Sequence, residues 1–381
     1  MTLHHHTTLE QRGDDVIVGD ELELEMYDDG GPDSAAAAFA GRMLGVLNDA
    51  ALALLTSVGH QTGLFEALAV LPPATSHEVA DAAGLDERYV REWLGGMTTA
   101  GVVRYDPSAA AYHLPPEHAA VLTAAAGPNN MALLMQHISM MGEVEKRTID
   151  RFRSGGGLTY ADYPHFHRNM AETSAAVHDS ALIEGILPLV PGLVERLEFG
   201  IDLADIGCGS GHAINLMATA FPRSRFTGYD FTERAILAAR AEAERLGLTN
   251  ARFELVDVAR LTAVERYDAV TAFDAIHDQA HPATVLANIR RALRPGGTFL
   301  MVDIDASSNL EDNIALPWAS YLYAISTFHC MSVSLGLGGD GLGTAWGRQL
   351  ALTMLADAGF GDIEEKDVEA DPFNAYFVAR P

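Results

Sequence analysis

Three aspartates stand where short apolar runs of the sequence end: Asp205, Asp230 and Asp257. The run before each acid has the length and β-branched or aromatic content of a buried strand. Directly after Asp205 comes the turn GCGSG at 207–211, which opens a predicted helix over 212–220. Glycines are needed there because a Cβ would block a ligand lying across the turn. The pattern predicts a site for a ligand that contains a nucleoside.

The order of the acids predicts how this ligand is held. Asp230 ends the second predicted strand, so its carboxylate is expected to accept hydrogen bonds from both ribose hydroxyls. Phe231 is expected to pack on the adenine face. Asp257 and Val258, after the third strand, are expected at the adenine edge, where Asp257 accepts from the amino group. For each acid the alternative is a helix N-cap, and this alternative is strongest for Asp257.

Two histidines are candidates for acid–base chemistry. His277 lies just past the fourth predicted strand, 267–273, at the rim where open α/β sheets place their ligands. An imidazole titrates near neutrality, so we predict that His277 takes the acceptor's proton, and His329 is the alternative base. Packing beneath a loop is the other explanation for His277. His281 and Asp278 supply no evident third ligand, so no metal site is predicted.

The elements that must position these residues alternate along the second half of the chain. Strands are predicted over 202–206, 226–230, 252–256, 267–273 and 298–303, with amphipathic helices between them. This alternation indicates an α/β fold with a parallel, doubly wound sheet. A domain boundary is placed near residue 190.

The series resembles the class I methyltransferases that depend on S-adenosylmethionine (SAM). The matching segments are ADIGCGSG (204–211), GYD (228–230), VD (256–257), YDAVTAFDAIHD (267–278) and LRPGG (293–297), and the resemblance covers about residues 195–381. It implies a Rossmann-like, seven-stranded domain whose sheet ends with an antiparallel strand, which residues 373–379 suit. A nicotinamide cofactor is the second choice for the glycine turn alone, and the LRPGG segment and the closing strand pair argue against it.

The resemblance also implies which residues bind the cofactor. The acid and the glycines of the first turn would hold the methionine part of SAM, Asp230 the ribose and Asp257 the adenine. Asp274, at the end of the fourth strand, is predicted to contact the cofactor as well. The residues assigned to the methionine part are Asp205, Gly207, Gly209 and Gly211.

The first half of the chain has helical spacing. Helices are predicted over 35–58, 63–69, 76–83 and 87–100, followed by short strands over 102–105 and 111–114. The helix at 76–83 has a capping box of Thr75 and Glu78. Helices and a hairpin in this order indicate a winged helix-turn-helix. Further helices are predicted over 129–153 and 164–187, so that 35–189 forms a winged-helix and substrate-cover domain.

The whole chain more closely resembles actinobacterial winged-helix methyltransferases that are often labelled transcriptional regulators. In related small-molecule enzymes the winged-helix domain serves dimerisation and covers the substrate pocket, which implies a homodimer through 35–58. The helix at 87–100 pairs Arg88 and Arg91 with Glu87 and Glu92, so it lacks the basic stripe that a phosphate-binding surface needs. A SAM-sensing DNA-binding regulator and a protein methyltransferase remain alternatives.

Two regions are candidates for covering the acceptor. Tyr163, Phe166 and Met170 belong to an aromatic patch that, by the resemblance, lies on a helix closing over SAM. The insertion 306–344 is rich in aromatic residues and methionine, which suits an apolar substrate lid or ordinary core packing. Its glycine cluster at 336–343 follows no strand and is predicted to be a mobile loop. Methionines at 131–141 either line the acceptor pocket or fill helix cores.

Composition sets the remaining expectations. The 381 residues carry 52 acidic and 25 basic side chains, a formal net charge of −27, which disfavours nucleic acid and anionic lipid as partners. Residues 1–34 are expected to be a disordered acidic tail. Two cysteines and no apolar run of membrane-spanning length favour a cytoplasmic protein. The prediction is SAM-dependent methyl transfer to a small, largely apolar acceptor, at oxygen.

Overall fold

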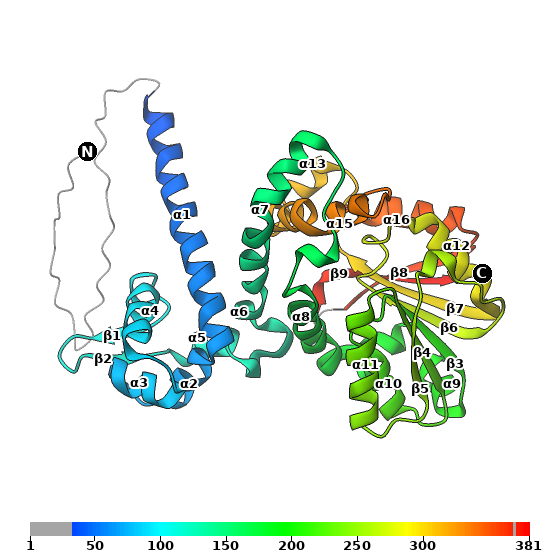
Figure 1. The fold of residues 1–381 in the computed structure, drawn as a ribbon, viewed down its shortest axis with the longest axis horizontal. Coiled ribbons are helices and arrows are strands. Elements are labelled where there is room, and N and C mark those ends of the chain that lie inside the picture. Colours follow the sequence, from blue (N-terminus) through cyan, green and yellow to red (C-terminus); the bar gives the residue numbers. More distant parts are fainter. Residues whose placement is uncertain (1–32, 369–370) are drawn as a thin grey trace.

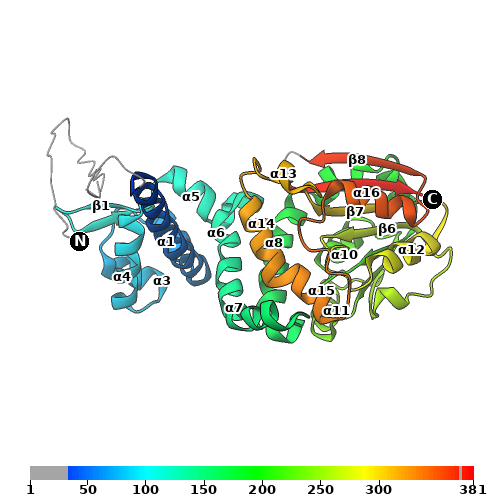
Figure 2. The same ribbon diagram turned by 90° about the horizontal axis from the view of Figure 1, so that it is seen from above.

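The computed structural model describes residues 33–368 and 371–381 and contains two lobes joined by helices. In Figures 1 and 2 the N-terminal lobe and the large sheet lie at opposite ends of the longest axis, with α6, α7 and α8 between them. The predicted acidic tail falls outside the described residues except for its last two, which begin the first helix.

The N-terminal lobe has the helices and the hairpin of a winged helix-turn-helix, as predicted. The capping box forms, because the Thr75 amide donates to Glu78 at 2.8 Å and the Glu78 amide donates to the Thr75 hydroxyl at 3.4 Å. Asp86 caps the next helix by accepting from the Arg88 amide at 3.0 Å. The elements are α1 (Asp33–Thr62), α2 (Leu64–Val70), α3 (Ser76–Ala83), α4 (Glu87–Thr99), β1 (Arg104–Asp106) and β2 (Ala111–His113).

A run of helices connects the two lobes. It contains α5 (Pro116–Leu122), η1 (Ala124–Asn129), α6 (Met131–Leu134), α7 (Gln136–Ser154), η2 (Tyr160–Asp162), α8 (Phe166–Ala181), η3 (Leu182–Ile186) and η4 (Leu187–Leu189). The turn η3 is a π-helix that continues α8. The helix predicted at 164–187 is therefore α-helical over 166–181 and π-helical over 182–186.

The sheet of the second lobe has seven strands in the order β5-β4-β3-β6-β7-β9-β8. The strands are β3 (Asp202–Ile206), β4 (Arg225–Asp230), β5 (Ala251–Leu255), β6 (Tyr267–Phe273), β7 (Leu293–Ile304), β8 (Asp362–Val368) and β9 (Asp371–Arg380). The pairs among β3 to β7 are parallel, and β9 is antiparallel to both β7 and β8. The chain order reverses at β3, so the carboxyl ends of β3, β4 and β6 meet at a switch point.

Both faces of the sheet are buried beneath helices. On one face lie α9 (Leu193–Phe199), α10 (His212–Ala220) and α11 (Glu233–Arg245), and on the other lie α12 (Pro282–Ala292) and α16 (Gly347–Asp357). Strand β7 shows the pattern, because Leu300 and Val302 enter one core while Phe299 and Met301 enter the other.

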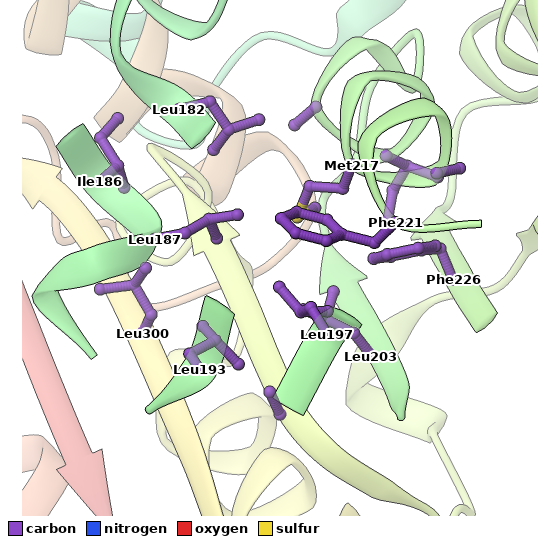
Figure 3. Close-up of a cluster of buried hydrophobic side chains, with 14 of the residues drawn as sticks. Leu182, Ile186, Leu187, Leu193, Leu197, Leu203, Met217, Phe221, Phe226 and Leu300 are labelled. Atoms are coloured by element: carbon purple, nitrogen blue, oxygen red, sulfur yellow. The ribbon is translucent and has the colours of Figure 1, made fainter. Parts of the chain in front are cut away.

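The helix α8 and its π-helical end anchor the linking region to this sheet. Figure 3 shows Leu182, Ile186 and Leu187 pointing at side chains from the sheet and from α9 and α10. The predicted domain boundary near residue 190 therefore separates two segments that share one core. The N-terminal lobe has its own core, which includes Phe65, Trp93 and Leu94.

The insertion after β7 folds into helices and packs closely. It contains α13 (Leu310–Asn313), α14 (Ala319–Ile325), the π-helix η6 (Ser326–Cys330) and α15 (Met331–Gly336). A Cβ on Gly157 would lie 1.7 Å from the Ser332 carbonyl oxygen, and one on Gly336 would lie 2.0 Å from the Leu158 carbonyl oxygen. The glycines allow two backbones to touch. Residues 337–343 form a loop, as predicted, and Gly339 places it against Ala280, whereas its mobility stays a prediction.

The helix α1 projects beyond the N-terminal lobe. It is long and apolar enough to cross a membrane by length and composition alone, and none of its most apolar window is buried. The prediction that no apolar run reaches this length is therefore wrong for α1. Its exposed apolar side chains recur at helical spacing, and they include Phe39, Met43, Leu47, Leu54 and Val58.

Candidate functional site

The glycine turn after β3 has the shape that its sequence predicts. Gly207, Gly209 and Gly211 all have positive φ, at 71°, 51° and 76°. A Cβ on Gly211 would lie 2.5 Å from the Phe253 ring, so this glycine allows α10 to pack against β5. A Cβ on Gly209 would meet nothing within 4 Å. The space over Gly209 is thus open to a ligand, as a backbone cradle requires.

Asp205 is buried at the end of β3. The Thr271 hydroxyl donates to its carboxylate at 2.7 Å. Burial raises the pKa of Asp205 to about 7, and the charge of Asp230 adds to this rise. A cationic group of a ligand at this position would compensate the burial of the carboxylate, which suits the ammonium of a bound amino acid moiety.

Asp230 joins the end of β4 to the glycine turn. One carboxylate oxygen accepts from the Gly209 amide at 3.0 Å, and the other accepts from the Thr232 amide at 2.7 Å. The carboxylate therefore lies beside the open face of the turn, at the strand end where a ribose is expected. The Phe231 ring is 40% exposed and meets the Tyr160 ring edge-on, with a centroid distance of 5.4 Å.

The two residues predicted at the adenine edge lie in different surroundings. Val258 is buried and lines the cavity described below. Asp257 caps the short helix η5 (Val258–Arg260) by accepting from the Ala259 amide at 3.0 Å, and its side chain is 53% exposed. Asp257 does not line the cavity, so its geometry matches the helix cap, the alternative left open by the sequence.

Further acids meet at the end of β6. Asp274 adopts a positive φ of 48°, and one of its carboxylate oxygens is buried and has no hydrogen-bond partner among the described residues. Asn374 bridges it to Asp371, donating to Asp371 at 2.9 Å and to Asp274 at 3.5 Å. Burial and the charges of Asp303 and Asp371 raise the pKa of Asp274. The site is therefore built to face a positive or uncharged ligand.

His277 is fixed by a carboxylate at the end of the neighbouring strand. Its Nδ1 lies 2.7 Å from Asp303, which also accepts from the Trp346 indole at 2.9 Å. The Nε2 atom lies 3.3 Å from Asp278. Burial by itself would lower the pKa of His277, but the charges of Asp303 and Asp278 outweigh it and raise the pKa.

The second histidine, His329, lies in an aromatic cage. Its ring stacks on Phe166 at a centroid distance of 4.0 Å and meets the Tyr160 and Tyr163 rings edge-on at 5.7 and 4.9 Å. Burial lowers the pKa of His329 to about 4, so the ring is uncharged at neutral pH. Tyr163 itself points away from the ligand space, since its hydroxyl donates to the Phe328 carbonyl at 2.5 Å.

One large cavity of about 660 Å³ connects these groups. Most of the predicted site residues line it, and three do not: Gly211, Asp257 and Tyr163. The predicted residues that line it are Asp205, Gly207, Gly209, Asp230, Phe231, Val258, Asp274, Phe166, Met170, His277 and His329. The volume lies within the range of small-molecule and cofactor sites.

Several residues of the site were missed in the sequence. Asp303 ends the fifth strand, so the rule that marked the other strand ends would have found it. Asp303 does not line the cavity itself but holds His277, which does. His137 and Cys330 line the cavity, but their neighbours in sequence contain no pattern that indicates a site. Of the methionines at 131–141, Met131 lines the cavity, whereas Met140 and Met141 pack in a helix core.

A metal ion has one candidate position in the described part of the chain. Ligand atoms of His277, Asp278 and Cys330 lie within 4.8 Å of one another. His281, considered with Asp278 from the sequence, is exposed at the start of α12. Burial raises the pKa of the Cys330 thiol to about 11, so the thiol stays protonated at neutral pH and is a poor ligand in that form.

Comparisons with known proteins agree with this geometry. A family described as an Rv2258c-like winged HTH domain matches residues 50–124, and a family described as a methyltransferase domain matches residues 198–354. A ubiquinone biosynthesis O-methyltransferase of Cereibacter sphaeroides is 35% identical over 101 residues. That match covers 26% of this chain and 40% of the relative's length.

Solved structures share the fold over most of the chain. An O-methyltransferase from Nostoc punctiforme PCC 73102 has a TM-score of 0.68 at 16% identity and covers 89% of this chain and 98% of its own. Human N-acetylserotonin methyltransferase in complex with SAM has a TM-score of 0.64 at 16% identity, covering 90% and 97%. At such identities these similarities establish the fold.

Fold, glycine turn and domain content together define a class I SAM-dependent methyltransferase, with SAM as the cofactor of its Rossmann-like domain. N-terminal to that domain, residues 50–124 match the Rv2258c-like winged HTH domain.

Proposed function

We propose that this protein transfers the methyl group of SAM to an oxygen atom of a small, largely apolar acceptor. The observation that carries the proposal is the place of His277, which lines the same cavity as the glycine turn and is held there by Asp303. Bound SAM supplies an activated methyl group on a good leaving group. The residues of the chain then have to align the acceptor and take its proton.

The contacts of His277 support its role as the base. Because Asp303 occupies Nδ1, Nε2 is the nitrogen left for a hydroxyl of the acceptor; it lies 3.3 Å from Asp278 Oδ1, which makes no hydrogen bond within the described chain. Asp303 also stabilises the imidazolium that forms when the proton arrives. The backbone amide of Ile304 donates to Asp303 at 2.9 Å, and Trp346 donates to the same oxygen, so the carboxylate is rigidly oriented.

His329 is the weaker candidate for this role. Its lowered pKa of about 4 makes it a poorer proton acceptor than His277, and its ring is confined by Phe166 and two tyrosines. We therefore assign His329, which belongs to the insertion 306–344, to the wall of the acceptor site and not to proton transfer.

We call the part of the cavity that is lined by α7, α8 and α14 the acceptor half, and its side chains support an apolar acceptor. Its wall contains Phe166 and Met170 of α8 and Tyr321, Leu322 and Ile325 of α14. These helices cover the cavity, so a small molecule fits the site better than a side chain on a folded protein. For this reason we favour a small-molecule acceptor over the protein methyltransferase alternative.

The winged helix supports an enzyme better than a DNA-binding regulator. In α4 the Arg88 guanidinium pairs with Glu92, and Arg91 pairs with Glu87 at 3.3 Å. Both basic groups of the helix that would enter a groove are therefore already paired with acids. A gel-shift experiment at physiological salt tests this directly, and specific retention of DNA would support the regulator.

We also infer a cytoplasmic homodimer in which α1 packs against the α1 of a second copy. Exposed apolar side chains at helical spacing along a soluble domain mark an interface. Leu47 is 66% exposed on α1, and Leu237 is 57% exposed on α11. Leu47→Asp is expected to yield a monomer in light scattering, whereas Leu237→Asp leaves the dimer intact. Membrane association of the wild type in a flotation assay would contradict the inference.

The proposed reaction is tested by incubating the protein with SAM and a panel of phenols and catechols. We expect O-methylated products by mass spectrometry with the wild type and none above background with His277→Ala. Matched amines and thiols are tested beside them. Methylation at nitrogen, sulfur or carbon, with no O-methylated product, would contradict the proposal of an oxygen acceptor.

A further inference from the structure

A buried histidine outside the proposed reaction faces the acceptor half of the cavity. His137 of α7 is 2% exposed and lines the cavity. Its Nδ1 lies 2.5 Å from the Tyr321 hydroxyl, and the two rings are nearly parallel, with 14° between their planes. The Tyr321 contact fixes the orientation of the imidazole.

The other nitrogen of this ring has no partner. The Nε2 atom of His137 is buried and makes no hydrogen bond within the described chain. A buried polar atom without a partner is rare in a folded protein, and in a cavity wall it marks a position where a ligand completes the hydrogen bonding. Because Tyr321 fixes the ring through Nδ1, this position is built in advance of binding.

The acceptor half brings His137 close to the proposed base. Asp278 lies 3.3 Å from His277 Nε2 and 3.9 Å from His329 Nδ1. The His329 ring stacks on Phe166, which packs on the same core cluster as Tyr321, the partner of His137. Because both histidines line this cavity, we take an acceptor whose hydroxyl reaches His277 to extend along this wall toward His137. The apolar wall between them contains Phe166, Tyr321 and Ile325.

The charges of the cavity limit what the acceptor carries there. No arginine or lysine of the described chain lines it, whereas aspartates line it in number: Asp205, Asp230, Asp274, Asp278 and Asp371. Burial lowers the pKa of His137 to about 4, so the ring contributes no positive charge at neutral pH. Away from His277, whose pKa is raised, a carboxylate or phosphate on the acceptor would face these acids with no lysine or arginine of the described lining to compensate its charge.

We propose that His137 is a specificity residue whose Nε2 binds a second, uncharged oxygen of the acceptor. The acceptor is then an uncharged aromatic molecule with two oxygens, one methylated at His277 and one hydroxyl or carbonyl held at His137. This inference rests on the proposed function and adds the substrate class to it.

Two variants separate recognition from a structural role of the ring. The amide of asparagine replaces the Nδ1 end of histidine, so His137→Asn keeps a partner for Tyr321 and loses the Nε2 group. The longer amide of glutamine reaches the Nε2 position, so His137→Gln keeps a polar group at that position and loses the Tyr321 contact. Recognition through Nε2 predicts that the glutamine variant binds like the wild type. A role in holding Tyr321 predicts the reverse order.

The experiment is a calorimetric titration of naphthol, the dihydroxynaphthalene isomers and a hydroxynaphthoate into protein saturated with S-adenosylhomocysteine. We expect one dihydroxy isomer to bind at least about tenfold more tightly than naphthol, as one good hydrogen bond provides. The asparagine variant should lose this gain and the glutamine variant should keep most of it. The hydroxynaphthoate should bind more weakly than naphthol.

Several outcomes would overturn the inference. They are tightest binding by the hydroxynaphthoate, equal binding of naphthol and all dihydroxy isomers, a greater loss in the glutamine variant than in the asparagine variant, or no binding of any probe. The titration of S-adenosylhomocysteine in the same samples reports on the proposed function separately. If the wild type does not bind S-adenosylhomocysteine, the proposed function itself fails. If it binds S-adenosylhomocysteine but the probes give one of the outcomes above, only the proposed acceptor class is wrong.

Discussion

The two halves of the cavity are built from different kinds of structure. The cofactor half is made of backbone and short side chains that directly follow β3, β4 and β6, such as Gly209 and Asp230. The acceptor half is made of side chains on helices that are distant in sequence, and the His137–Tyr321 pair spans 184 residues. The first half is a property of the fold, and the second is a property of this chain. Variants in the two halves should therefore separate cofactor binding from turnover.

The largest effect is expected at the proposed base. His277→Ala should lower turnover by about 10²- to 10⁴-fold, the usual contribution of a positioned general base, because no group then takes the acceptor's proton. SAM affinity should stay unchanged. Turnover is measured under single-turnover conditions with the best acceptor of the phenol panel. His281→Ala is the matched control, since His281 is exposed and outside the cavity. Unchanged turnover in His277→Ala would remove it from the mechanism.

The carboxylate behind the base should set the pH dependence. Only the uncharged His277 ring accepts a proton, so turnover should rise with pH through a midpoint above 6.5, because Asp303 and Asp278 raise this pKa. Asp303→Asn removes one of these charges and should move the midpoint to lower pH. It should also lower the plateau by roughly tenfold to hundredfold, as the loss of an orienting carboxylate does.

The pH profiles of the two proteins are compared at saturating SAM. A midpoint that stays in place in Asp303→Asn would show that Asp303 does not control the ionisation of His277.

A smaller effect is expected where the insertion after β7, residues 306–344, packs against the segment between α7 and α8. Gly157→Ala should push the Leu158 backbone away from Ser332, to which its amide donates at 3.1 Å. We expect a loss of about 1–3 kcal/mol in the free energy of unfolding, measured in urea, as overpacking causes. Gly142→Ala is the control, because its Cβ would meet nothing within 4 Å. Equal stability of the two variants would indicate that the insertion does not pack tightly against Gly157.

The smallest effect is expected from removing metal ions. If His277 acts as a base, dialysis against a chelator should leave turnover unchanged. A loss of activity that zinc restores, together with metal in the purified protein, would instead assign His277, Asp278 and Cys330 to a metal site.

The cofactor half of the cavity could be predicted from the sequence, whereas the acceptor half could not. The parallel sheet and the winged helix were predictable because strand and helix periods and cap residues are local, whereas the antiparallel closing strand was expected from the family resemblance. The acids at strand ends were predictable for the same reason, and Asp257 shows the limit, since the same pattern also produces a helix cap. The acceptor half was not predictable, because nothing near His137 indicates that Tyr321 meets it. The packing of the glycines at 336–343 was missed because contact with Leu158 arises only in three dimensions.

The most direct test of the central claim, a cofactor site built from strand ends and separate from the base, is a calorimetric titration of SAM into the wild type and three variants. The wild type, His277→Ala and Asp257→Ala should bind alike, because the first lacks only the base and the second only a helix cap. Asp230→Ala should bind at least about tenfold more weakly, because a charged hydrogen-bond acceptor is lost. No binding of SAM by the wild type, or equal affinities for Asp230→Ala and the wild type, would contradict the account.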